Sequence, residues 1–273
     1  MAECGLANLG SCVVQKFFEF LLSILNVSLQ PLLTLNKSLL AEPVHLELFS
    51  SLWALIVYVL SFFYGFLLMY AGFTFIISGY DAAKREEAKS WLRNTIIMII
   101  LVQASFFIYE LVVELSAVLT SSMLHLISDQ FFVLTSETIS SIGLNLFLIV
   151  SYLIILLLSS VLLIVRYASV AIGVMLFPLG IFLYFIQPLR SYGILILNFL
   201  GISVFITLLD VILLVGFSKL VEIPPFSNIK IVVMIAAFLL INLCMFFFMF
   251  FSIIKAAIST GTRLMSLAAL FGA

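Results

Sequence analysis

The chain has 273 residues, of which 65% are hydrophobic and 9% are charged. Soluble domains carry roughly 25% charged residues, so this composition excludes an ordinary water-soluble fold and predicts a chain that is solvated by lipid. The net charge of −1 provides no global basic surface for nucleic acid or anionic headgroups, so any contact with a polynucleotide has to be local.

The N-terminal segment, residues 1–48, alternates apolar clusters with polar side chains, and none of its apolar runs reaches spanning length. Pro31 interrupts this segment, and a proline disfavours an unbroken helix because it lacks a backbone N–H. The pattern predicts two amphipathic helices that lie in the membrane interface. The alternative is one tilted span over residues 13–40, which would cross the membrane despite its polar residues.

Two cysteines, Cys4 and Cys12, are separated by seven residues that include two glycines. The topology given below places both outside the cytoplasm, where disulfides form if the compartment is oxidising. We expect a disulfide between them, and two free thiols are the alternative. Cys244 lies inside an apolar run and is expected to stay reduced.

Six apolar runs are long enough to cross a bilayer as helices, which takes about 20 residues each. Helices are predicted because every backbone group in lipid must be paired internally. The runs cover residues 50–78, 95–119, 142–165, 167–187, 192–217 and 231–254.

Only Arg166 and Tyr167 separate the third run from the fourth. Because the two runs together are about twice the length of one crossing, we predict a tight hairpin at this point. The sequence thus predicts an all-α polytopic bundle of about six transmembrane helices over residues 49–256, preceded by interfacial helices in residues 1–48 and followed by a short tail at 257–273.

A short charged segment, residues 80–94, separates the first two apolar runs. Asp81 is a suitable N-cap for the strong helix formers that follow it. Arg85, Lys89 and Arg93 are spaced by four residues, so on a helix they form one basic stripe. The segment is either a solvated loop that obeys the positive-inside rule or a docking surface for a cytoplasmic partner.

Lysine and arginine residues near the spans predict the orientation of the chain. Six spans put seven of these residues on one side and five on the other, and four of the seven lie in the charged segment. This predicts a multi-pass protein of the cytoplasmic membrane with residues 80–94 in the cytoplasm and both termini outside.

Polar residues inside the apolar runs need partners away from lipid. The amides of Gln103, Asn145, Asn198 and Asn242 are expected to join helices. A buried charge is costly, so Asp210 is a candidate functional residue, and we predict that Arg166 pairs with it inside the bundle.

Small residues and one proline indicate how the helices pack. Gly65 and Gly72 in the first run, and Gly173 and Gly180 in the fourth, recur at helical spacing and predict close backbone approach. Pro178 removes one hydrogen bond and is expected to kink the fourth span.

Two stretches resemble a known family. The segment "YAGFTFIISGYDAAKREEAKSWLRNTIIMIILV" resembles the charged turn between two spans in small membrane subunits of conjugation and type IV secretion machines. The segment "VRYASVAIGVMLFPLGIFLYFIQPLR", with "FPLG" at residues 177–180, resembles the polytopic inner-membrane subunit of these systems, the TrbL-like family, which includes the membrane component of archaeal DNA importers.

The resemblance implies an oligomeric channel or platform subunit. Its partners would be a cytoplasmic conjugation-type ATPase, other secretion subunits, membrane lipid, and single-stranded DNA or protein in transit. This chain lacks the large soluble loops of many bacterial members.

The sequence contains no zinc-protease motif, aspartate pair or nucleotide loop, so we expect no enzyme activity, cofactor or metal. Three function classes stay open: a translocation subunit, an ion-coupled transporter or ion channel that uses Asp210, and a passive scaffold.

Overall fold

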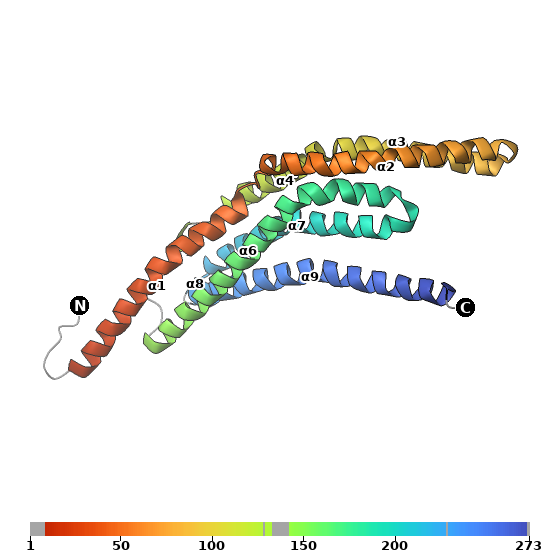
Figure 1. Cartoon of the computed structure of the whole chain (residues 1–273). Coiled ribbons are helices and arrows are strands. Elements are labelled where there is room, and N and C mark those ends of the chain that lie inside the picture. Colours follow the sequence, from red (N-terminus) through yellow and green to blue (C-terminus); the bar gives the residue numbers. More distant parts are fainter. Residues whose placement is uncertain (1–8, 128, 133–141, 228, 272–273) are drawn as a thin grey trace. The chain divides into compact units, whose positions relative to one another are not determined.

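The computed structural model describes residues 9–127, 129–132, 142–227 and 229–271, and within these ranges it contains helices and no strand (Figure 1). The predicted all-α class is confirmed. The α-helices are α1 (Leu9–Ala41), α2 (Ser50–Ile77), α3 (Ala82–Gln103), α4 (Ser105–Leu124), α5 (Asp129–Phe132), α6 (Ile142–Phe185), α7 (Arg190–Val221), α8 (Pro224–Ser227) and α9 (Lys230–Phe271).

Among the described residues, five helical stretches are long and apolar enough to cross a membrane. They are Leu46–Ile77, Ser105–Leu124, Phe147–Phe185, Gln187–Val221 and Lys230–Phe251. Their outer surfaces are apolar: on α2, Phe62 is 71% exposed and Ile76 is 75% exposed. Large apolar side chains facing outward along several long helices are what a lipid environment requires, so the chain is a multi-pass membrane protein.

The predicted hairpin between the third and fourth spans is wrong. Helix α6 continues without a break from Ile142 to Phe185, so two predicted spans form one helix of 44 residues. At 1.5 Å per residue its length is about 66 Å. The turn is predicted because the two runs together have about twice the length of one crossing. In the structure the Arg166 side chain is only 5% exposed and donates to two backbone carbonyls of α7. The guanidinium of Arg166 is therefore hydrogen-bonded to α7 while α6 continues past it as a helix.

The predicted break at Pro31 is also wrong, because α1 is one helix with Pro31 inside it. A proline leaves the carbonyl four residues earlier, here that of Val27, without its helical donor, and its ring crowds that carbonyl. Both Pro31 and Val27 are exposed on α1, so the lost hydrogen bond lies away from the buried face of the helix.

The predicted second span is divided between two helices, α3 and α4, which meet at Ala104. The backbone remains hydrogen-bonded through this point, since Ala104 N–H donates to Ile100 and Ile108 N–H donates to Ala104. Trp53 of α2 donates from Nε1 to Ser105 Oγ at 2.8 Å, which ties α2 to the junction.

Contacts divide the chain into two units that interleave along the sequence. The first takes the described residues within Met1–Glu42, Ala117–Val165 and Thr207–Phe246. The second takes those within Pro43–Ser116, Arg166–Ile206 and Phe247–Ala273. The predicted division at residues 48 and 256 stays a prediction.

In the first unit, two adjacent serines of α6 join different helices. Asn36 of α1 donates from Nδ2 to Ser160 Oγ at 3.0 Å. Ser159 Oγ donates to Asn242 Oδ1 of α9 at 2.8 Å, and the amide of Asn242 donates in turn to the carbonyl of Ile155. Adjacent residues project about 100° apart on a helix, so Ser160 can bond to α1 while Ser159 bonds to α9. The predicted joining role is confirmed for Asn242.

The same role is wrong for two other amides, because Gln103 and Asn198 are exposed. The side chain of Asn145 lies outside the described residues.

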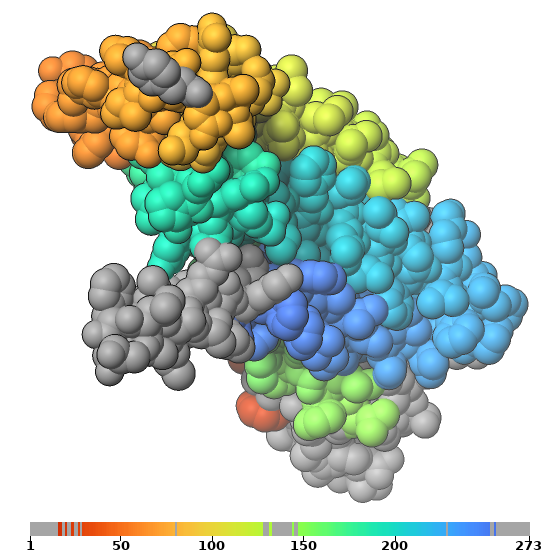
Figure 2. All heavy atoms as spheres, turned by 90° about the vertical axis from the view of Figure 1, so that its right-hand side faces the viewer, coloured from red at the N-terminus to blue at the C-terminus, as the bar shows by residue number. Residues whose placement is uncertain are grey.

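In the second unit, α2 and α3 form an antiparallel hairpin, and the second half of α6 forms another with the first part of α7 (Figure 1). One buried apolar cluster packs the first hairpin against the second: Val57, Leu60, Tyr64, Met98, Val102, Ile181 and Phe182. Figure 2 shows the orange α2–α3 surface resting on the teal turn between α6 and α7.

Glycines allow the close approach of α6 and α7. A Cβ added at Gly193 would meet the backbone of Tyr184, and one at Gly180 would lie 3.0 Å from the side chain of Ile196. Gly173 leaves room for the Tyr109 hydroxyl. Close packing is therefore confirmed at Gly173 and Gly180.

The same prediction is wrong for Gly65 and Gly72. A Cβ added at either position on α2 would meet nothing within 4 Å.

Candidate functional site

The charged half of α3, residues 82–94, begins at a side-chain cap. Asp81 has an extended backbone, and its carboxylate accepts from the N–H of Ala83 at 3.0 Å. This is the predicted N-cap, and it satisfies one of the N–H groups that a helix start leaves without an intrahelical partner.

One face of this helix packs and the opposite face is open. Ala88 is fully buried, and Thr95 and Met98 continue the same face toward the membrane-spanning part. The three cations of the predicted basic stripe, Arg85, Lys89 and Arg93, are all exposed. Because the buried face at Ala88 packs against the protein, the three exposed cations lie together on the open surface of one helix.

Local contacts partly neutralise the stripe. Lys89 Nζ lies 2.7 Å from Glu86 Oε1 in an exposed ion pair. The hydrogen bond and the charge of Lys89 hold the pKa of the Glu86 carboxyl below its usual value. The guanidinium carbon of Arg85 lies 5.9 Å from the ring centroid of Phe75. Exposed pairs of this kind contribute little stability, so a stronger acidic ligand can displace Glu86.

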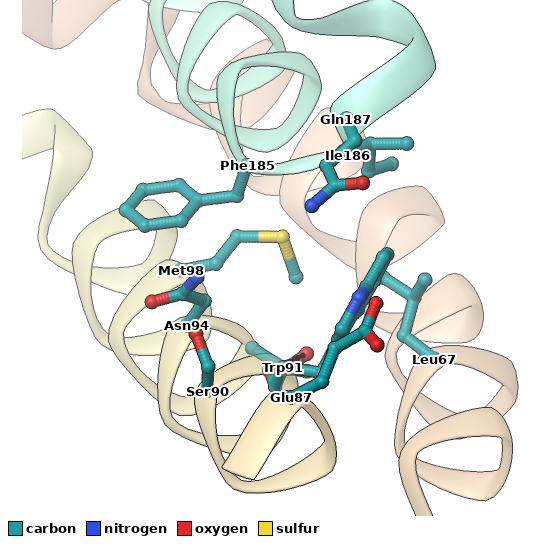
Figure 3. A pocket seen from close by; sticks show the side chains of 10 residues that line it. Leu67, Glu87, Ser90, Trp91, Asn94, Met98, Phe185, Ile186 and Gln187 are labelled. Carbon is teal, nitrogen blue, oxygen red and sulfur yellow. Dashed lines mark hydrogen bonds between the residues drawn. The ribbon is translucent and has the colours of Figure 1, made fainter. Parts of the chain in front are cut away.

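A pocket lies beside the charged half of α3 (Figure 3). Its volume is about 110 Å³, and α3 contributes most of its lining. The lining residues are Leu67, Glu87, Ser90, Trp91, Asn94, Thr95, Met98, Phe185, Ile186 and Gln187. The sequence reasoning missed this pocket, although Glu87, Ser90 and Trp91 follow helical spacing that places them on one face.

A second polar cluster is buried around Arg166. Its Nε donates to the carbonyl of Ser203 at 2.9 Å, and its Nη2 donates to that of Val204 at 3.1 Å. Ser116 of α4 donates to the same Val204 carbonyl at 2.9 Å. Tyr109 of α4 donates to the carbonyl of Val170, one turn after Arg166, at 2.8 Å. The cluster links α4, α6 and α7 within the second unit.

Asp210 is fully buried in α7. The predicted pair between Arg166 and Asp210 stays a prediction. Pro178 is buried inside α6, which continues past it, and the predicted kink also stays a prediction.

The predicted disulfide falls on Cys4, which lies outside the described residues, and on Cys12, whose side chain lies outside them too. Cys244 is a free thiol that is partly buried in α9. Within the described ranges, no three His, Cys, Asp or Glu side chains gather into a group that could hold a metal ion.

Comparisons with protein-family models, with curated proteins and with solved structures find no match to this chain.

Proposed function

We propose that the chain is a channel or platform subunit of a DNA or protein translocation machine of the type IV secretion or conjugation kind. The observation that carries the proposal is the charged half of α3, which is capped by Asp81, packed through Ala88, and open to solvent along the basic stripe. The resemblance of this segment to small membrane subunits of conjugation and type IV secretion machines, and that of the "FPLG" span to the TrbL-like family, add support. The stripe is the docking surface for the acidic face of a cytoplasmic conjugation-type ATPase.

The proposed orientation places the charged half of α3 in the cytoplasm. Glu87 and Gln187 line one pocket, which supports placing the α6–α7 turn on the same side of the membrane. The cytoplasmic side then holds Lys84, Arg85, Lys89, Arg93 and Arg190, in accord with the positive-inside rule. The earlier assignment of both termini to the outside relied on the hairpin at Arg166. With α6 crossing once, the N-terminus lies outside and the C-terminus lies in the cytoplasm.

Reversal of the stripe tests the docking role. We expect the triple variant Arg85→Glu, Lys89→Glu, Arg93→Glu to lose the ATPase on affinity purification in mild detergent, because like charges would face each other across the contact. Membrane insertion should persist, since all three side chains are exposed.

Lys84→Glu is the matched control, because Lys84 is an exposed cation of the same helix that lies off the stripe. Its ATPase yield should stay near that of the wild type. Equal recovery of the ATPase by the triple variant and by the wild type would rule out docking at the stripe.

A second candidate function is ion-coupled transport or ion conduction. The observation that favours it is the complete burial of Asp210 inside a membrane-capable helix, one turn after the buried Thr207. Ionisable residues in such positions commonly line ion pathways.

A further inference from the structure

The pocket beside α3 combines an apolar floor with a polar rim. Met98 is buried, and Leu67, Phe185 and Ile186 are half-buried. Glu87, Asn94 and Gln187 are exposed at the rim. Figure 3 shows Glu87 and Trp91 on the α3 side and Phe185 and Gln187 on the side of the α6–α7 turn.

The rim holds an acidic group beside an aromatic ring. Among the described residues, Glu87 forms no ion pair, in contrast to its neighbour Glu86, which pairs with Lys89. The ring of Trp91 packs edge-on against Tyr70, with centroids 5.5 Å apart. A carboxylate next to an indole face attracts cations through both charge and the ring quadrupole.

The pocket lies where the sequence of α3 changes from mostly polar to mostly apolar, which is the pattern expected at a lipid–water boundary. On α3 the residues before Asn94 are mostly charged or polar and those after Thr95 are mostly apolar. Tyr70 and Trp91 are the side chains that favour the headgroup level. Phe66 and Phe73 of α2 are exposed on the adjacent lipid-facing surface. The group that meets this pocket at the highest concentration is therefore a lipid headgroup.

We propose that the pocket binds the primary ammonium of an aminophospholipid headgroup, as in phosphatidylethanolamine, from the surrounding membrane. The ammonium lies between the Glu87 carboxylate and the Trp91 ring, and the amide oxygens of Asn94 and Gln187 accept its remaining hydrogens. A volume of about 110 Å³ gives room for several water-sized groups, enough for an ethanolamine.

The same chemistry discriminates between headgroups. A quaternary choline has no N–H to donate to a carboxylate or an amide. Phosphatidylglycerol carries no cation to pair with Glu87. Free ethanolamine lacks the acyl chains that lie against the apolar surface of α2, so it should bind far more weakly than the lipid.

Native mass spectrometry of the full chain, delipidated and titrated with single lipids, tests the site. We expect phosphatidylethanolamine to bind about tenfold more tightly than phosphatidylcholine or phosphatidylglycerol, in keeping with a charge-assisted hydrogen bond. Glu87→Gln should remove this preference. Glu86→Gln is the matched control, since Glu86 lies one residue away and outside the pocket, and it should keep the preference.

Thermal melting in detergent shows whether Glu87→Gln is folded, and Trp91→Leu provides a second variant that should weaken the same preference. Equal affinity of the wild type for the three lipids would overturn the proposal. So would an unchanged preference in a folded Glu87→Gln protein, or binding of free ethanolamine as tight as that of the lipid.

Discussion

At the scale of single residues, Arg166 shows how the chain keeps a charge inside an apolar helix. Two of its guanidinium nitrogens donate to successive carbonyls of α7, which already belong to a helix. A carbonyl oxygen has two lone pairs, so a helical carbonyl such as that of Ser203 can accept a further hydrogen bond, and the Val204 carbonyl is shared between Arg166 and Ser116. The planar fork of arginine suits two adjacent acceptors better than the single ammonium of lysine.

Arg166→Lys should therefore destabilise the protein even though it keeps the charge. We expect a loss of about 1.5–3 kcal/mol, the range for hydrogen bonds to charged groups, seen as a lower melting temperature in detergent. Arg93→Lys is the control at an exposed arginine and should leave the melting temperature unchanged. If the two variants had the same melting temperature, the two hydrogen bonds of the Arg166 guanidinium would make no contribution to stability.

At the scale of helices, the sequence predicts most of the elements because apolar length decides them. The N-cap at Asp81, the stripe on α3 and the joining role of Asn242 follow from local spacing or from the cost of an isolated polar group in lipid. The unbroken α6 was not predictable in this way. Its continuity at Arg166 depends on carbonyls 37 and 38 residues further along the chain, and sequence periodicity gives no information about such a contact.

Cysteine labelling distinguishes an unbroken α6 from a hairpin. Ala168 directly follows the predicted turn at Arg166 and Tyr167, and it lies on the exposed surface of α6 inside the apolar stretch Phe147–Phe185. In a background without native cysteines, Ala168→Cys should resist a membrane-impermeant maleimide added to inside-out vesicles, because lipid covers it.

Lys84→Cys, on the charged half of α3, should label under the same conditions and serves as the positive control. A hairpin would instead bring position 168 to the cytoplasmic surface. Rapid labelling there, at the rate of position 84, would contradict a membrane-buried α6.

At the scale of the whole molecule, the two candidate functions make different demands on the chain. A translocation subunit needs the basic stripe and an ATPase, whereas an ion-coupled protein needs Asp210 and no partner. The stripe and Asp210 lie in different units, so we expect variants at the two sites to act independently, and they can be combined.

An ion-flux measurement on purified protein in liposomes tests ion transport or conduction in the absence of an ATPase. If Asp210 is an ion site, the wild type should carry an ion flux that Asp210→Asn reduces by about tenfold or more, because the amide cannot hold a charge. The triple variant of the stripe should keep this flux. Absence of any flux from the folded wild type would exclude the ion-coupled function and leave the translocation subunit and the passive scaffold.

The cap at Asp81 and the burial of Ala88 have a consequence for kinetics. A segment that folds only on binding must order itself at each encounter, but the charged half of α3 is already ordered. Two preformed, oppositely charged surfaces associate under electrostatic steering, at a rate that falls as ionic strength rises. Salt would thus act on the association rate of a partner at the stripe, and no slow folding step of this helix would limit how often partners exchange.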